Sequence, residues 1–269
     1  MTRSEQQRRR ENRIYAALSV AFIATAIGFL YLNNLRGKVA LDARTLCPQN
    51  DAPVSLLVVM VDTSDSLNIV QRTAVTNQIQ QATSKIPDHG EVELFTIGPV
   101  TNTLLEPQVS VCNPGNAKGA SELTSNQQLI GKRWKKKFIE PLNKQLARML
   151  GGSGSKDSPI MEGIQSVAVS VFGKPDFHDV NNRQLIIVSD MLQNTAGYSH
   201  YRGDESYSRF RTSSYCLKVR PNLDGVDVTI LYLRRAEVRR LQGKRHLKFW
   251  EDYFTDAKAR LMHVVSIEG

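Results

Sequence analysis

Apolar and polar positions change their spacing several times along the chain, and each change predicts a new element. Residues 54–61 form an apolar run, which is typical of a strand buried on both faces of a parallel sheet. From residue 67 the apolar residues recur every three to five positions, the spacing of a helix that packs one face against a sheet. The sequence PDHG at 87–90 ends that helix.

The same alternation of strands and helices continues to the C-terminus. Further strands are expected at 91–97, 104–112, 184–189, 226–233 and 262–267. Further helices are expected at 129–149, 159–172 and 246–261. The link between the second and third strands is so short that it favours an antiparallel pair. The pattern therefore predicts a doubly wound, Rossmann-like α/β fold: a mostly parallel six-stranded sheet with one antiparallel edge strand and helices on both faces.

An uncharged segment precedes this domain. Residues 14–32 carry no charged side chain, and as a helix they would reach roughly 28 Å, enough to cross the core of a bilayer. The residues before them include five arginines, which favours a cytoplasmic N-terminus. A cleaved signal peptide is the alternative, but no small-x-small cleavage site follows the apolar run. We therefore expect four parts: a basic cytoplasmic tail at 1–13, a transmembrane helix at 14–32, a linker at 33–53 and a folded domain at 54–269.

The net charge bears on the partners of the protein, and the cysteines agree with a location outside the cytoplasm. The formal net charge of +9 favours acidic partners. Cys47 and Cys112 can pair in an oxidising compartment, and Cys216 is then either free or the true partner of one of them. The simplest fit is a single-pass protein of a bacterial inner membrane whose C-terminal domain lies in the periplasm. Nucleic acid is not an expected partner of such a domain.

Small polar and acidic residues gather where two of the predicted strands end. The strand at 54–61 runs into the sequence DTSDS at 62–66, and the strand at 184–189 runs into Asp190. In doubly wound sheets, ligands bind beyond the carboxyl ends of the strands, at the point where the winding direction reverses. These positions therefore predict a binding site at one edge of the sheet, although each segment alone could also be a polar turn.

The motif Asp62-x-Ser64-x-Ser66 after a buried first strand resembles the metal-ion-dependent adhesion site of von Willebrand factor type A (vWA) domains. The resemblance covers residues 54–269 and includes the order of the strands, the early hairpin and Asp190. It implies that a threonine from a later loop completes the site, and that the assembled oxygen ligands hold a divalent cation, usually Mg²⁺. This chain has no threonine at that position. Ser158, in the sequence KDSPIMEGI, keeps the hydroxyl and lacks the methyl group.

The predicted metal ligands are therefore Asp62, Ser64, Ser66, Ser158 and Asp190. Mg²⁺ takes six oxygen ligands at about 2.1 Å. Hydroxyl ligands are neutral, so they leave the ion able to accept a carboxylate from another protein. Mn²⁺ or Ca²⁺ could take the same kind of site. Helix capping is the alternative role for Ser66 and Ser158, and a turn or capping role is the alternative for Asp190.

Basic residues follow the strand predicted at 226–233 and should lie on the same rim as the metal. They are Arg234, Arg235, Arg239 and Arg240. A positive rim suits an acidic protein partner. A solvated rim without a partner fits the sequence equally well.

Three functions fit these features to different degrees. The first is a membrane-anchored, vWA-like adhesion or scaffold module of the cell envelope that binds an acidic protein through Mg²⁺. The second is the same fold with a metal-free site, acting as a structural component of an envelope, secretion or conjugation assembly. The third is a metal-dependent phosphohydrolase, which is disfavoured because the D-x-D motif, the P-loop and the G-x-S-x-G motif are all absent. We therefore expect no enzymatic activity.

Overall fold

The computed structural model of the chain describes residues 3–36, 39–98, 103–116, 126–152, 154–203 and 206–269. The chain divides into two compact units, Met1–Leu41 and Asp42–Gly269. Each unit is described separately here.

The first unit contains one long helix, α1 (Arg3–Arg36). It covers the predicted apolar segment at 14–32 together with residues on both sides of it. Among the residues that the structure describes, no helix combines the length and the apolar character needed to cross a membrane. The predicted transmembrane span at 14–32 is therefore not confirmed.

The second unit is built on a six-stranded sheet in the order β3-β2-β1-β4-β5-β6. The strands are β1 (Leu56–Asp62), β2 (Glu91–Ile97), β3 (Val109–Cys112), β4 (Arg183–Ser189), β5 (Val226–Leu233) and β6 (Arg260–Ile267). The β2–β3 pair is antiparallel and all other pairs are parallel. The predicted mostly parallel sheet with one antiparallel edge strand is confirmed.

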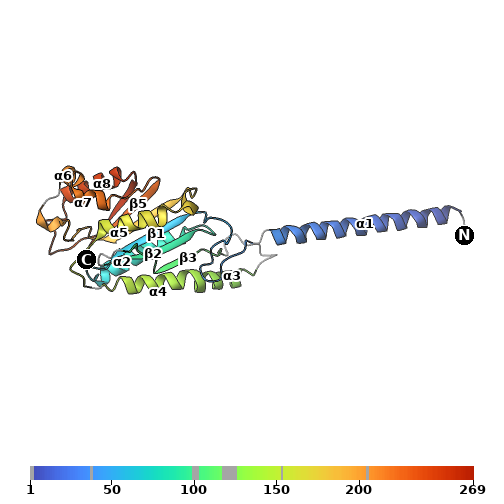
Figure 1. Cartoon of the computed structure of the whole chain (residues 1–269). Coiled ribbons are helices and arrows are strands. Elements are labelled where there is room, and N and C mark those ends of the chain that lie inside the picture. The colour runs from blue at the N-terminus through green and yellow to red at the C-terminus, as the bar shows by residue number, and fades with distance from the viewer. Residues whose placement is uncertain (1–2, 37–38, 99–102, 117–125, 153, 204–205) are drawn as a thin grey trace. The chain divides into compact units, whose positions relative to one another are not determined.

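Helices cover both faces of this sheet (Figure 1). One face packs against α5 (Ile160–Val167), α6 (Tyr207–Arg211), α7 (Ser214–Val219) and α8 (Lys244–Asp256). The other face packs against α2 (Ile69–Ser84), α3 (Gln127–Trp134) and α4 (Glu140–Met149). Alternate residues of β1 enter the two cores: Val58 and Met60 on the first face, Val59 and Val61 on the second. This two-sided burial explains why β1 is apolar along its whole length.

Some element boundaries differ from the predicted ones. The helix predicted at 129–149 is interrupted by a π-helical turn at Lys135–Ile139, and the helix predicted at 159–172 ends in another at Ala168–Phe172. Such turns depend on tertiary packing, and a simple helical period does not reveal them. Helices α6 and α7 have only five and six residues, too few to show a periodic pattern, and they were not predicted.

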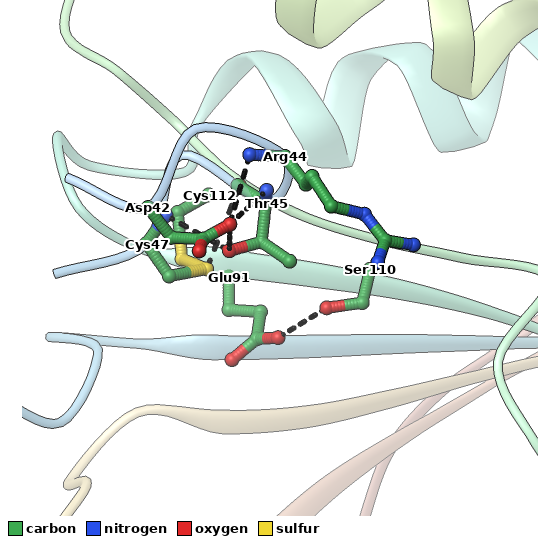
Figure 2. Close-up of a disulfide and its surroundings, with 7 residues drawn as sticks. All are labelled: Asp42, Arg44, Thr45, Cys47, Glu91, Ser110 and Cys112. Carbon is green, nitrogen blue, oxygen red and sulfur yellow. Dashed lines mark hydrogen bonds between the residues drawn. A yellow bond between two sulfur atoms is a disulfide. The ribbon is translucent and has the colours of Figure 1, made fainter. Parts of the chain in front are cut away.

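A disulfide joins Cys47 to Cys112, with 4.8 Å between the Cα atoms (Figure 2). It attaches the segment before β1 to the edge strand β3. The backbone supports the same contact, because the Cys112 N–H donates to the Thr45 carbonyl at 2.7 Å. Asp42 closes the turn before Cys47 by accepting hydrogen bonds from Arg44 and Thr45. The predicted pairing is confirmed, and Cys216 is a buried free thiol.

Candidate metal site at the strand ends

The candidate site lies where the winding of the sheet reverses, between β1 and β4. From β1 the chain continues to β2 on one side, and β4 pairs with β1 on the other side. The parallel register pairs Val61 with Val188. It therefore brings Asp62, the last residue of β1, beside Ser189, the last residue of β4. Ligands of doubly wound folds bind at this switch point.

Asp62 is the centre of a buried hydrogen-bond network. Its Oδ2 atom accepts from the Ser158 hydroxyl at 2.9 Å and from the Ser189 hydroxyl at 2.8 Å. Its Oδ1 atom accepts from the Ser64 backbone N–H at 3.0 Å. Only 4% of the Asp62 surface is exposed. Three segments distant in sequence are thus joined through one carboxylate.

The loop before α5 carries Ser158 to this carboxylate. The Ser158 backbone forms two hydrogen bonds with Asn194, at 2.9 and 3.0 Å, so the loop pairs with the segment after β4. Pro159, not Ser158, occupies the N-cap position of α5, and this N-cap residue forms no capping hydrogen bond through its side chain. The capping role considered for Ser158 is therefore wrong, and its hydroxyl is directed to Asp62 instead.

Helix α2 also begins without help from the DTSDS segment. Its N-cap is Asn68, which forms a reciprocal capping box with Gln71. The capping alternative for Ser66 is therefore wrong as well. The Ser66 carbonyl accepts a hydrogen bond from Arg235 at 3.1 Å. Its Cα atom packs against Gly152, where an added Cβ would lie only 2.7 Å away.

A cavity of about 460 Å³ opens over this network. Its lining is polar and comes mainly from the two strand ends and the loop before α5. The lining residues are Ser64, Asp65, Gly154, Ser155, Lys156, Ser158, Asp190, Leu192, Asn194 and Tyr201. Three of the five predicted ligands line it directly, and Asp62 lies behind it, bonded to Ser158. Among the described residues, Asp65 rather than Ser66 completes the lining.

Asp190 is the second buried carboxyl group of the site, with 4% of its surface exposed. Its Oδ1 atom accepts from the Leu192 N–H at 2.9 Å. Burial, reinforced by the nearby Asp62, raises the pKa of Asp190 to about 7, while the Leu192 N–H and Arg235 oppose this shift. A bound cation would favour the ionised form of this group.

The four rim arginines divide into two kinds. The Arg235 guanidinium lies between Asp190 and Asp65, with Nε 3.8 Å from Asp190 Oδ2 and Nη2 3.9 Å from Asp65 Oδ2. Arg234 Nε lies 3.8 Å from Glu268 Oε1. Arg239 and Arg240 are exposed on the segment between β5 and α8. Two of the four predicted rim arginines are thus paired with carboxylates of their own chain.

The donor set suits a hard divalent cation. Carboxylate and hydroxyl oxygens are the ligands of Mg²⁺, Mn²⁺ and Ca²⁺, and the cavity leaves room for water ligands. A second possible cluster consists of Cys47, Glu91 and Cys112. Its two sulfur atoms are joined in the disulfide, so they do not offer thiolates to an ion.

Two residues of the site have roles that the sequence analysis did not assign. The Ser189 hydroxyl donates to Asp62 and accepts from the Met191 N–H at 2.8 Å. The sequence did offer a signal for Ser189. This residue ends the strand that precedes Asp190, and parallel pairing of that strand with β1 places it beside Asp62. The Gln242 side chain donates to the Asp190 carbonyl at 3.2 Å from a distant loop, and no sequence pattern indicates that contact.

No protein-family model and no curated protein matches the chain. Among solved structures, the conserved hypothetical protein BatB from Bacteroides thetaiotaomicron is 11% identical, with a TM-score of 0.40 over 80% of this chain and 91% of that one. An aerotolerance-related membrane protein from Bacteroides fragilis is 11% identical, with a TM-score of 0.36 over 79% and 91%. Proximal thread matrix protein 1 from the mussel byssus is 12% identical, with a TM-score of 0.36 over 71% and 42%. Likenesses this distant carry no functional conclusion for this chain.

Proposed function

We propose that this protein is a vWA-like interaction module of the cell envelope that binds an acidic protein partner through a divalent cation. One observation carries the proposal. Asp62, Ser158 and Asp190 come from three distant segments, and they meet at the switch point of a doubly wound sheet, around one polar cavity. A polar turn would not need such convergence, whereas a ligand site does.

In this proposal, Ser64, Ser158 and Asp190 face the cation, and Asp62 orients Ser158 from behind. Mg²⁺ is the expected ion, with Mn²⁺ or Ca²⁺ as substitutes. A bound cation would supply an open coordination position for a carboxylate of the partner. Arg239 and Arg240, exposed on the segment between β5 and α8, would attract an acidic surface and speed its approach. We expect no catalysis from this arrangement.

The envelope location is part of the same proposal. It rests on the uncharged segment at 14–32, on the arginines before it and on the disulfide, which persists in oxidising compartments. Large apolar side chains of α1, such as Phe22 and Phe29, are exposed. We infer an inner-membrane protein with a cytoplasmic N-terminus and a periplasmic domain.

A metal-free module is the second candidate, and Arg235 favours it. Its guanidinium already supplies positive charge beside Asp65 and Asp190. In that case the partner would bind to the rim and the helical surfaces, in an envelope, secretion or conjugation assembly.

Partner capture separates the two candidates. The full chain would be crosslinked in membranes with Mg²⁺ or with EDTA, beside the variants Asp190→Asn and Arg239→Gln. Under the metal proposal, EDTA and Asp190→Asn both abolish capture, whereas Arg239→Gln only weakens it. Capture that survives EDTA and Asp190→Asn but fails in Arg239→Gln would support the metal-free module. Phosphatase turnover by the purified chain would contradict both.

A further inference from the structure

Arg235 combines burial, charge and position in an unusual way. Its side chain is only 16% exposed and lies between the carboxylates of Asp190 and Asp65. It follows β5, so it approaches the site from a different strand than either aspartate. The guanidinium brings a fixed positive charge to the carboxylates that a divalent cation would use.

The fold holds this arginine in place. The Gln242 side chain, which is almost fully buried, accepts from the Arg235 backbone N–H at 2.7 Å. The same amide donates to the Asp190 carbonyl at 3.2 Å and to the Leu233 carbonyl at 2.7 Å. The Arg235 Nη1 atom donates to the Ser66 carbonyl at 3.1 Å. Both the backbone and the side chain of Arg235 are therefore positioned toward the site.

The contacts of Arg235 with the two carboxylates are short enough for ion pairs but too long for hydrogen bonds. At 3.8 and 3.9 Å they exceed the usual limit for N–H···O bonds. The Nε atom is buried and has no hydrogen-bond partner among the described residues. The guanidinium thus offsets the negative charge of the site without occupying its oxygen atoms in hydrogen bonds. Such an arrangement leaves those oxygens open to a second cation.

We propose that Arg235 is a resident counter-ion of the strand-end site, which stabilises the metal-free protein and lowers the affinity of the site for a divalent cation. The second half of this inference rests on the proposed function, whereas the first half does not. Without metal, Arg235 keeps two neighbouring carboxylates from repelling each other. When a cation enters, the guanidinium repels it and has to move aside.

Two variants of the full chain test this inference. Arg235→Gln removes the charge and keeps a polar side chain, although a shorter one. Lys156→Gln is the matched control: Lys156 lines the same cavity and is exposed, but it forms no ion pair with a described residue. Each protein would be titrated with MgCl₂ by calorimetry, and its melting temperature would be measured in EDTA.

The expected result has two parts. In EDTA, Arg235→Gln melts several degrees below the wild type, and Mg²⁺ reverses most of this loss. In the titration, Arg235→Gln binds Mg²⁺ on the order of tenfold more tightly than the wild type, because a unit charge near a buried site changes affinity by about that much. Lys156→Gln shows a clearly smaller change in both measurements.

Different failures point to different errors. An unchanged melting temperature of Arg235→Gln in EDTA would overturn the counter-ion role, whatever the metal does. Unchanged or weaker Mg²⁺ binding by Arg235→Gln, or equally tight binding by Lys156→Gln, would overturn its effect on affinity. If Arg235→Gln is destabilised in EDTA but neither it nor the wild type responds to Mg²⁺, the counter-ion role stands and the metal part of the proposed function fails.

Discussion

One oxygen of Asp62 accepts hydrogen bonds from two serines, which allows a direct test of how the loop before α5 and the end of β4 are joined to the end of β1. Ser158 and Ser189 both donate to Asp62 Oδ2, at 2.9 and 2.8 Å, and all three residues are buried. Replacing each serine by alanine removes one donor. A hydrogen bond to a carboxylate contributes about 1.5–3 kcal/mol, so we expect Ser158→Ala to lower the free energy of unfolding by about 2 kcal/mol.

Ser189→Ala should cost more, about 3 kcal/mol, because it also leaves the buried Met191 N–H without its acceptor. The double variant should lose more than the sum of the two. With one donor left, the carboxylate oxygen is still satisfied, whereas with none it is buried and unpaired. The expected coupling is on the order of 1 kcal/mol. Ser158→Thr keeps the hydroxyl and should stay within about 1 kcal/mol of the wild type.

Urea unfolding of the full chain in EDTA, followed by tryptophan fluorescence, measures these values. Both tryptophans lie in the second unit, and the ring of Trp250 is buried, so the signal reports on the unit that contains the site. Ser84→Ala, on the exposed surface of α2, is the control and should change stability by less than about 0.5 kcal/mol. If Ser158→Ala behaves like this control, the hydroxyl does not join the loop to Asp62 and the reasoning is refuted.

Three further predictions concern groups outside the site. Burial, and then the neighbouring Glu91, raises the pKa of Glu93 from 4.5 to about 7, so the folded protein keeps a proton that the unfolded chain releases. Glu93 should therefore contribute a fall in stability of about 3 kcal/mol as the pH rises from 4.5 to 7, and Glu93→Gln should make the fall seen in urea unfolding across pH smaller than that of the wild type by this amount. Cys112→Ser opens a disulfide between residues 65 positions apart and should cost about 4 kcal/mol by the same assay, as should reduction of the wild type. His200 is fully buried with no hydrogen-bond partner for either ring nitrogen among the described residues, so His200→Leu should cost less than about 1 kcal/mol or stabilise the fold, as measured by its melting temperature.

The sequence predicted the sheet well because burial on both faces leaves a simple signal. β1 lies at the centre of the sheet, and helices cover it on both sides, so every position from Leu56 to Val61 is apolar. The abrupt change at Asp62 then marked the end of the strand. Asp190 was found for the same reason at the end of β4.

Contacts that depend on three-dimensional packing were harder to predict. The position of Ser66 is fixed by the close approach of Gly152 and by Arg235, from loops distant in sequence. Arg235 itself was expected on a partner-facing rim. The sequence shows that a basic residue follows the strand, but it does not show where the side chain of that residue points. Helices α6 and α7 were missed since each is shorter than two helical turns.

Direct detection of a bound ion tests the central claim that the strand-end cavity is a metal site. Mn²⁺ gives a paramagnetic signal, and electron paramagnetic resonance separates free from bound ion. We predict that the full chain binds a single Mn²⁺, that Mg²⁺ displaces it, and that Asp190→Asn abolishes the binding. Equal Mn²⁺ binding by the wild type and by Asp190→Asn, or no binding by the wild type even at millimolar Mn²⁺, would contradict the account.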